Sequence, residues 1–192
     1  MAGACLLILL PVPAATVIPA LQVIIERRSA TVRGSDFWIA PGNGPVGVPD
    51  ALPFFSYLLD PSDELWNHEV EEADAIHAGF GFDPRGGIGV GAMCRGWESD
   101  MVLAELAIEL LTSQQGCVQF GGLLAPSLEP DAWRRWSSTQ SFHERARQLA
   151  EALGPYPGRL QTLTLDGEPS AHVVDRDFLR FWTTHAAFHI PN

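Results

Sequence analysis

Two histidines near the end of the chain, His185 and His189 in HAAFH, have the i, i+4 spacing of a helical zinc site. The motif lacks the glutamate that would complete a metalloprotease signature. A zinc site needs at least a third protein ligand, and the nearby candidates are His172 and Asp175. A metal-dependent enzyme that uses His172, His185 and His189 is therefore one hypothesis.

The competing interpretation of these histidines is packing in a core. On a helix that begins after Asp175, one continuous stripe is formed by four residues: Phe178, Trp182, His185 and His189. Histidines that share a stripe with large aromatic residues are expected to pack and to hydrogen-bond. We therefore expect no metal site and no cofactor.

Cys94 is the candidate for a thiol nucleophile, because it follows the apolar stretch GGIGVGAM at the end of an expected strand. A catalytic thiol needs a base, and His77 and His143 are the residues that could supply one. Alternation along the strand places Cys94 on the same face as Ile88, which favours a buried and unreactive thiol. A thiol-dependent enzyme is therefore the second form of the enzyme hypothesis. Because a buried thiol is the favoured interpretation, we expect no catalytic residue.

The charge balance limits the classes of partner. The chain has 23 acidic and 12 basic residues, all of the latter arginine, and a formal net charge of -11. Binding to nucleic acid through phosphate neutralisation requires a basic surface, so it is excluded, and an anionic membrane surface would repel the chain. A basic protein would be attracted to it.

The acids are concentrated in residues 60–75, which hold seven of them and no Lys or Arg. Trp66 lies among these acids, and interfaces favour aromatic anchors with polar surroundings. A partner surface and a solvated acidic loop both fit this composition. The residues expected to bind a partner are Asp60, Asp63, Glu64, Trp66, Glu69, Glu71, Glu72 and Asp74.

The elements that must position these groups begin with a buried strand, CLLILL at residues 5–10. A helix follows, with Pro19 in its first turn and Leu21, Ile24 and Ile25 facing inward. Residues 30–40 are expected to form one strand and residues 41–53 a loop. A short helix is expected within residues 69–82, ended by Gly79 or Gly81.

A second strand–helix–strand unit is expected from residue 86 to residue 124. The alternating glycines of its first strand would let a helix approach closely. The helix of this unit, within residues 98–116, would be capped by Ser99 or Glu98 and stopped by Gly116. On its outer face, Glu105 and Glu109 have no basic partner in the helix, so we expect them to be solvated.

The rest of the chain predicts a helix with a capping box at Ser141 and Glu144, a hairpin around Asp166-Gly167, and a last helix capped by Asp175. Together the pattern predicts an α+β fold, a ferredoxin-like α/β sandwich of two β-α-β units with a C-terminal helix, hairpin and final helix. Residues 1–192 are expected to form a single domain, with an acidic insertion at about 54–82 and a C-terminal extension at about 125–192.

The cysteines and the apolar start of the chain indicate the cellular compartment in which the protein is expected. Cys5, Cys94 and Cys117 are odd in number and have no C-x-x-C spacing, which suits a reducing cytoplasm. The first basic residue is Arg27, so the apolar start lacks the basic region of a signal peptide and is read as a strand. No stretch reaches the length of about 20 apolar residues that a membrane span requires.

Three stretches form a further pattern: GIGVGAMCRGWESDMVLAELAIELL, GCVQFGGLL and HVVDRDFLRFWTTHAAFHIPN. Together they resemble an actinobacterial family of unknown function, whose small acidic members are similar to immunity proteins of polymorphic toxin systems. The residues that match are Ala92, Met93, Cys94, Phe120, Gly121, Gly122, His185, Phe188 and His189. Arg95, Gln119 and Asn192 depart from the family pattern, which has Asn, Asp and Lys there. The resemblance covers the C-terminal half and brings no catalytic residue.

The leading hypothesis is a non-enzymatic, immunity-type protein of the cytoplasm that neutralises a basic partner protein, such as a toxin domain, by stoichiometric docking of its acidic surface. The metal- or thiol-dependent enzyme is the alternative. The oligomeric state and the order of strands in the sheet are left open by the sequence.

Overall fold

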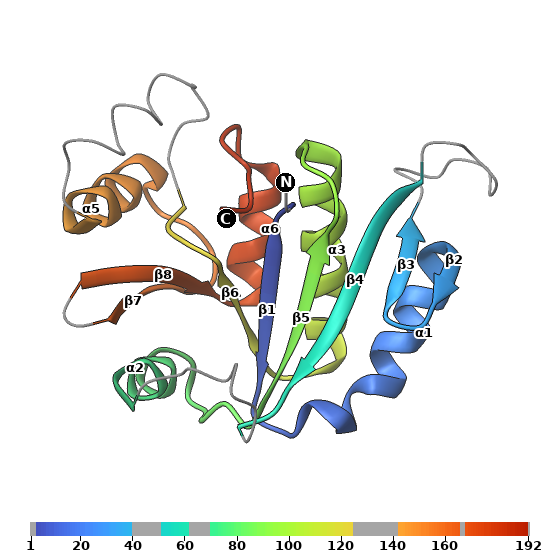
Figure 1. Ribbon diagram of the computed structural model, residues 1–192. Helices are drawn as coiled ribbons and strands as arrows, with labels where there is room; N and C mark the ends of the chain where they lie inside the picture. Colours follow the sequence, from blue (N-terminus) through green and yellow to red (C-terminus); the bar gives the residue numbers. More distant parts are fainter. Residues whose placement is uncertain (1–2, 40–50, 62–69, 125–141, 166–167, 192) are drawn as a thin grey trace.

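The structure is a computed structural model, and it describes residues 3–39, 51–61, 70–124, 142–165 and 168–191. It is a mixed α+β fold, built on one eight-stranded antiparallel sheet in the order β2-β3-β4-β5-β1-β6-β8-β7 (Figure 1). Five α-helices lie in the described residues. None of the helices in this part of the chain is long and apolar enough to cross a membrane.

The strands are β1 (Cys5–Leu10), β2 (Ser29–Arg33), β3 (Asp36–Ile39), β4 (Leu52–Leu59), β5 (Gly86–Ala92), β6 (Cys117–Phe120), β7 (Leu160–Leu165) and β8 (Glu168–Val174). The helices are α1 (Ile18–Arg28), α2 (Val70–Phe80), α3 (Trp97–Ser113), α5 (Phe142–Leu153) and α6 (Arg176–Thr184), with a short 3₁₀ helix, η1 (Ala14–Thr16).

Each face of the sheet has its own hydrophobic core. On the first face, Leu6 and Ile8 of β1 pack with the apolar sides of α1, α3, α5 and α6. On the second face, Leu9 packs with Ile76 and Phe80 of α2 and with neighbours from β6, β7 and β8. Figure 1 shows α1, α3 and α6 together on one side of the sheet. Strand β1 thus contributes alternate residues to two different cores.

The chain order of the elements agrees with most of the pattern expected from the sequence. β1, α1, α2, β5, β6, α5, the β7–β8 hairpin and α6 form within the expected segments, and α3 begins one residue before its segment. Asp175 caps α6, and its Oδ1 accepts a hydrogen bond from the Phe178 N–H at 2.9 Å. β5 and β6 lie on either side of β1 and run in the same direction, with α3 as the crossover between them.

The structure differs from expectation in two places within residues 30–59. The single strand expected at 30–40 is a hairpin, in which β2 and β3 are joined by a tight turn at Gly34, whose φ is 64°. Residues 52–59 form β4, a strand that the sequence reading did not assign. The expected loop at 41–53 lies mostly outside the described residues.

The alternating glycines of β5 do not admit a helix. Tyr57 lies opposite Gly89 and Phe55 lies opposite Gly91 in the β4–β5 register. A Cβ atom built on Gly89 would lie 2.0 Å from Cζ of Tyr57, and one on Gly91 would lie 2.3 Å from Cζ of Phe55. The rings of a neighbouring strand, rather than a helix, therefore occupy the space above the glycines.

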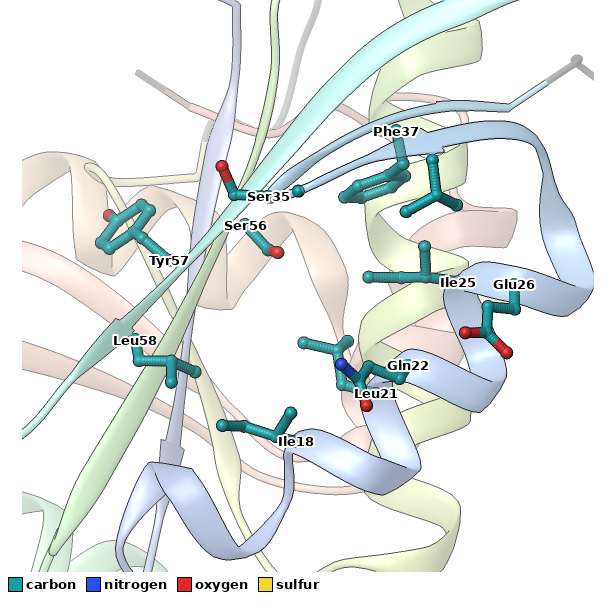
Figure 2. A pocket seen from close by; sticks show the side chains of 12 residues that line it. Ile18, Leu21, Gln22, Ile25, Glu26, Ser35, Phe37, Ser56, Tyr57 and Leu58 are labelled. Atoms are coloured by element: carbon teal, nitrogen blue, oxygen red, sulfur yellow. The ribbon is translucent and has the colours of Figure 1, made fainter.

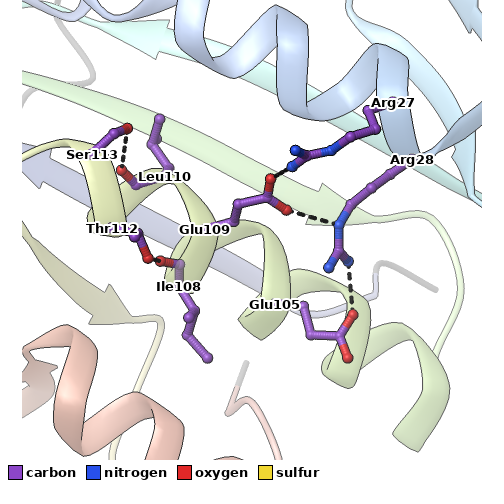
Figure 3. Close-up of polar contacts among 8 residues, drawn as sticks. All are labelled: Arg27, Arg28, Glu105, Ile108, Glu109, Leu110, Thr112 and Ser113. Atoms are coloured by element: carbon purple, nitrogen blue, oxygen red, sulfur yellow. Dashed lines mark hydrogen bonds and ion pairs between the residues drawn. The ribbon is translucent and has the colours of Figure 1, made fainter.

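The outer acids of α3 are paired with basic residues of another helix. Arg28 of α1 donates from Nη1 to Glu105 at 2.7 Å and from Nε to Glu109 at 3.0 Å (Figure 3). Arg27 forms an ion pair with the same Glu109 carboxylate. The expectation of two solvated, unpaired carboxylates is therefore wrong, because α1 and α3 lie side by side on the same face of the sheet.

The N-terminus of α3 also differs from expectation. Its N-cap residue is Gly96, which provides no side-chain hydrogen bond. Ser99 is buried in the first turn, and its hydroxyl donates to the Gly96 carbonyl at 2.7 Å. Ser141, expected to cap α5, lies outside the described residues.

Gly89→Ala is expected to lower the free energy of unfolding by about 1–3 kcal/mol, because the added methyl group would overlap the Tyr57 ring. Tyr57→Ala removes the ring, so the double variant should lose less than the sum of the two single losses. Urea unfolding of the wild type, both single variants and the double variant measures this coupling. Strictly additive losses would show that the methyl group and the ring do not meet.

Candidate functional site

The acidic residues expected to bind a partner are only partly described. Asp60 is half-buried directly after β4, and Asp74 is exposed on α2. Asp63, Glu64, Trp66 and Glu69 lie outside the described residues, and Glu71 is described only as part of the helical backbone of α2. The expected surface therefore begins where β4 ends and continues onto α2.

Glu72 differs from the other acids of this group because it is buried. Its exposed fraction is 7%, and the Ser170 hydroxyl of β8 donates to its Oε1 at 3.4 Å. The carboxylate of Glu72 thus faces the sheet rather than a partner. We leave it out of the candidate surface.

The clearest unpaired feature near these acids is the second half of β4. On one side β4 pairs with β5 from Phe54 to Leu59, but on the other side β3 pairs with it only from Leu52 to Phe55. Ser56 extends this pairing by one bond, from its N–H to the Ser35 carbonyl at 2.9 Å. Within the described residues, no strand pairs with β4 on this side beyond that point.

A cavity of about 240 Å³ opens beside this edge, between α1, the turn of the β2–β3 hairpin and β4 (Figure 2). Its floor is apolar and consists of buried Leu21, Ile25 and Phe37. Figure 2 shows Leu58 directed toward the cavity, whereas the Tyr57 ring lies on the other side of the strand. This arrangement follows from the alternation of side chains along a strand.

The rim of the cavity combines exposed apolar groups with one carboxylate. Val32 is 45% exposed and Leu58 is 39% exposed. Glu26 of α1 lines the mouth and is exposed. Large apolar side chains that remain accessible around a concave floor are typical of binding sites.

The basic residues closest in sequence to this cavity are directed elsewhere. Arg27 and Arg28 bind the acids of α3. The guanidinium group of Arg33 lies over the Trp38 ring, 5.7 Å from its centroid. Trp38 alternates with Phe37 along β3, so Arg33 lies on the opposite face of the sheet from the cavity. Among the described residues that line the cavity, Glu26 is therefore the one charged group.

The two histidines of HAAFH do not share a helix face, because α6 ends at Thr184. His185 is the C-cap residue, and its ring stacks on Trp182 with centroids 5.0 Å apart. His189 lies beyond a turn, and its ring is in a T-shaped arrangement with the same indole, with ring centroids 5.8 Å apart. The Trp182 Nε1–H donates to the His189 carbonyl at 3.0 Å. The tail thus folds back over Trp182, which is fully buried.

The tail is also held by α3. The Ile190 N–H donates to Oδ2 of Asp100 at 3.0 Å. Burial raises the pKa of the Asp100 carboxyl, and this hydrogen bond opposes the rise. Nδ1 of His189 donates to the Ala187 carbonyl at 2.8 Å, since a carbonyl can only accept, and no described residue bonds its buried Nε2. Burial lowers the pKa of His189.

His172 is engaged in the fold through a buried hydrogen bond. It is 1% exposed on β8, and its Nδ1 accepts a hydrogen bond from the Leu124 N–H at 2.8 Å. Burial lowers the pKa of His172 from its ordinary value of 6.5 to about 4, so the ring is neutral at physiological pH. In the described residues, no group of three or more His, Cys, Asp or Glu could hold a metal ion.

Cys94 is half-buried just beyond β5, and its carbonyl accepts a hydrogen bond from the Ser99 hydroxyl at 3.4 Å. His77 lies on α2, near the opposite end of β5 (Figure 1), and pairs with Asp83 at 2.8 Å. The length of β5 alone separates the two by roughly 20 Å. The side chain of His143 is outside the described residues. His77 is therefore not the base of a Cys94 thiol.

The free edge of β4 and the cavity were missed in the sequence reading. The signal was present, because residues 52–59, LPFFSYLL, form an apolar run of strand length that is rich in aromatic residues. β3 pairs with only the first half of β4, because β3 begins directly after the hairpin turn at Gly34. The sequence reading placed this turn inside a single strand.

His172 is expected to make folding stability depend on pH. Because its folded pKa of about 4 lies below the unfolded value, the unfolded chain binds a proton first as the pH falls from about 6.5 to about 4. The free energy of unfolding should therefore fall in this window, by about 3 kcal/mol at most. His172→Asn keeps an acceptor for the Leu124 N–H and should lose this part of the pH dependence. Urea unfolding of both chains at several pH values measures it, and parallel curves would contradict it.

Comparison with known proteins places the chain in one family. The model of DUF6368, a family of unknown function, matches residues 2–192. No curated protein and no solved structure matches the chain. The expectation of a family of unknown function is confirmed, and its actinobacterial origin and likeness to immunity proteins stay predictions.

Proposed function

We propose that this chain, which belongs to the DUF6368 family of unknown function, is a non-catalytic binding protein that docks a basic partner protein. In this proposal it is of the immunity type. It neutralises its partner by covering a cationic site in a one-to-one complex. The acidic surface attracts the partner, and apolar groups within it provide the close contact.

The charge of the chain supports the first part of this proposal. A formal net charge of -11 gives the molecule a field that accelerates encounter with a cationic partner. Several arginines are already paired within the fold, as Arg147 is with Glu144 and Glu151. Residues 60–75 hold seven acids and no Lys or Arg, so this segment contributes -7 to the formal net charge of -11.

The observation that carries the proposal is an apolar cavity beside the first residue of this acidic segment. Leu58 lines the cavity, and Asp60 follows it after one residue. An apolar contact surrounded by charge is the arrangement that gives both affinity and selectivity at interfaces. The acids alone would give attraction without a defined complex.

Two further parts of the proposal concern the fold and the location. The order β4-β5-β1-β6, with α1 and α3 as crossovers on one face, supports a ferredoxin-like core to which the β2–β3 and β7–β8 hairpins are added at the two edges. The three cysteines are free, which supports a reducing compartment such as the cytoplasm.

Co-expression with the protein encoded beside it is expected to yield a one-to-one complex with a basic partner. Raising the salt concentration from about 0.1 M to about 1 M shortens the Debye length from about 10 Å to about 3 Å, so the affinity should fall steeply. Trp66→Ala should weaken the complex by removing an aromatic anchor. Calorimetric titration at several salt concentrations measures both effects.

The control for this test is Trp97→Ala, because Trp97 is 61% exposed at the start of α3 and outside the acidic segment. It removes the same side chain and should leave the affinity unchanged. A co-expressed neighbour that does not bind, or a complex that is insensitive to salt, would contradict the proposed function.

A further inference from the structure

We propose that the edge of β4 from Ser56 to Leu59, with which no described strand pairs beyond the Ser56 N–H, binds an extended segment of the basic partner as an added strand. One large apolar side chain of that segment enters the cavity beside α1. This inference rests on the proposed function and specifies how the partner is held. The surface formed by this edge and the cavity is called the β4 groove below.

The backbone of β4 offers hydrogen-bonding groups on the open side. Because the Ser56 N–H points toward β3, alternation along the strand directs the N–H and C=O of Leu58 to that same side. The residues that alternate with them, Tyr57 and Leu59, direct their backbone N–H and C=O groups toward β5 instead. An added strand would satisfy the Leu58 groups and the Ser56 carbonyl, as in other cases of strand addition to a sheet edge.

In the part of the chain that the structure describes, the edge also lacks the usual protection against such pairing. Sheet edges in soluble proteins are commonly guarded by a charged side chain, a proline or a bulge. Here the two central residues of the edge are apolar and accessible, with Tyr57 37% and Leu58 39% exposed. The register of β4 with β5 is continuous from Phe54 to Leu59, without a bulge.

The cavity is large enough to anchor one side chain of the added strand. Its volume of about 240 Å³ exceeds the volume of about 150 Å³ that holds a benzene molecule in an engineered protein cavity. The side chains of a strand beside β4 would alternate between the two faces of the sheet. Those on the side of Leu58 would meet the apolar floor formed by Leu21, Ile25 and Phe37.

The charges around the β4 groove determine the occupant. Glu26 lies at the cavity mouth, and Asp60 follows the edge at the start of the segment that holds seven acids and no Lys or Arg. A segment with Lys or Arg on either side of its apolar anchor complements this field. A second copy of the chain would bring the same carboxylates against each other, so pairing of two β4 edges is disfavoured.

Selection of short random peptides displayed on phage tests this inference without knowledge of the natural partner. The selected peptides are expected to carry a net positive charge and apolar residues at alternate positions. Leu58→Pro removes the N–H that faces the open side, at an edge position where proline is tolerated, and should weaken peptide binding by about tenfold or more. Leu58→Val keeps the N–H and should bind within about twofold of the wild type.

A pair of charge variants tests the occupant. Glu26→Arg should weaken binding of the basic peptides by about tenfold, whereas Glu98→Arg makes the same charge change at an exposed position of α3 and should have little effect. Thermal melting of each variant confirms that it folds.

Three outcomes would overturn the inference: selection of acidic peptides, equal binding to Leu58→Pro and the wild type, or a dimer of the free chain that Leu58→Pro dissociates. If the co-expressed partner binds with the expected salt dependence and the Leu58→Pro variant binds it equally well, only the inference about the β4 groove is wrong. If no basic protein binds at all, the proposed function itself fails.

Discussion

The register of β4 with its two neighbours is the constraint from which the main features of this fold follow. Pairing with β5 places Phe55 and Tyr57 opposite Gly91 and Gly89, so aromatic rings cover the glycines. Pairing with β3 ends at Ser56, because the β2–β3 hairpin turns at Gly34. Within the described residues, the same strand therefore has one edge that pairs with β5 from Phe54 to Leu59 and one that is open beyond Ser56, beside an apolar cavity.

The helices on the first face hold this arrangement in place. Leu21 and Ile25 of α1 form part of the cavity floor and also belong to the larger core. Arg27 and Arg28, at the end of α1, bind the acids of α3 and are thus kept away from the cavity mouth. The ion pairs are partly exposed, so their contribution to stability is small. Their larger effect is to hold two guanidinium groups away from the cavity mouth.

Local features of the sequence predicted most elements correctly, because the apolar periodicity and the capping residues of a helix are local. Pro19, Asp175 and the inward stripe of α1 are examples. The failures concern contacts between distant segments. The partners of Glu105 and Glu109, the rings over the β5 glycines and the fold-back of His189 each depend on residues that pattern reading could not bring together. The site was predicted by composition alone, so Glu72 was included although it is buried.

The most direct test of this account is amide hydrogen exchange of the free protein, followed residue by residue by NMR. The amides of Tyr57 and Leu59 are bonded to β5 and should exchange slowly, whereas the Leu58 amide faces the open edge and should exchange much faster than both. Fast exchange at Leu58 between two protected neighbours is the predicted result. Protection of Leu58 equal to that of Tyr57 and Leu59 would show that the edge is already occupied and would contradict the account.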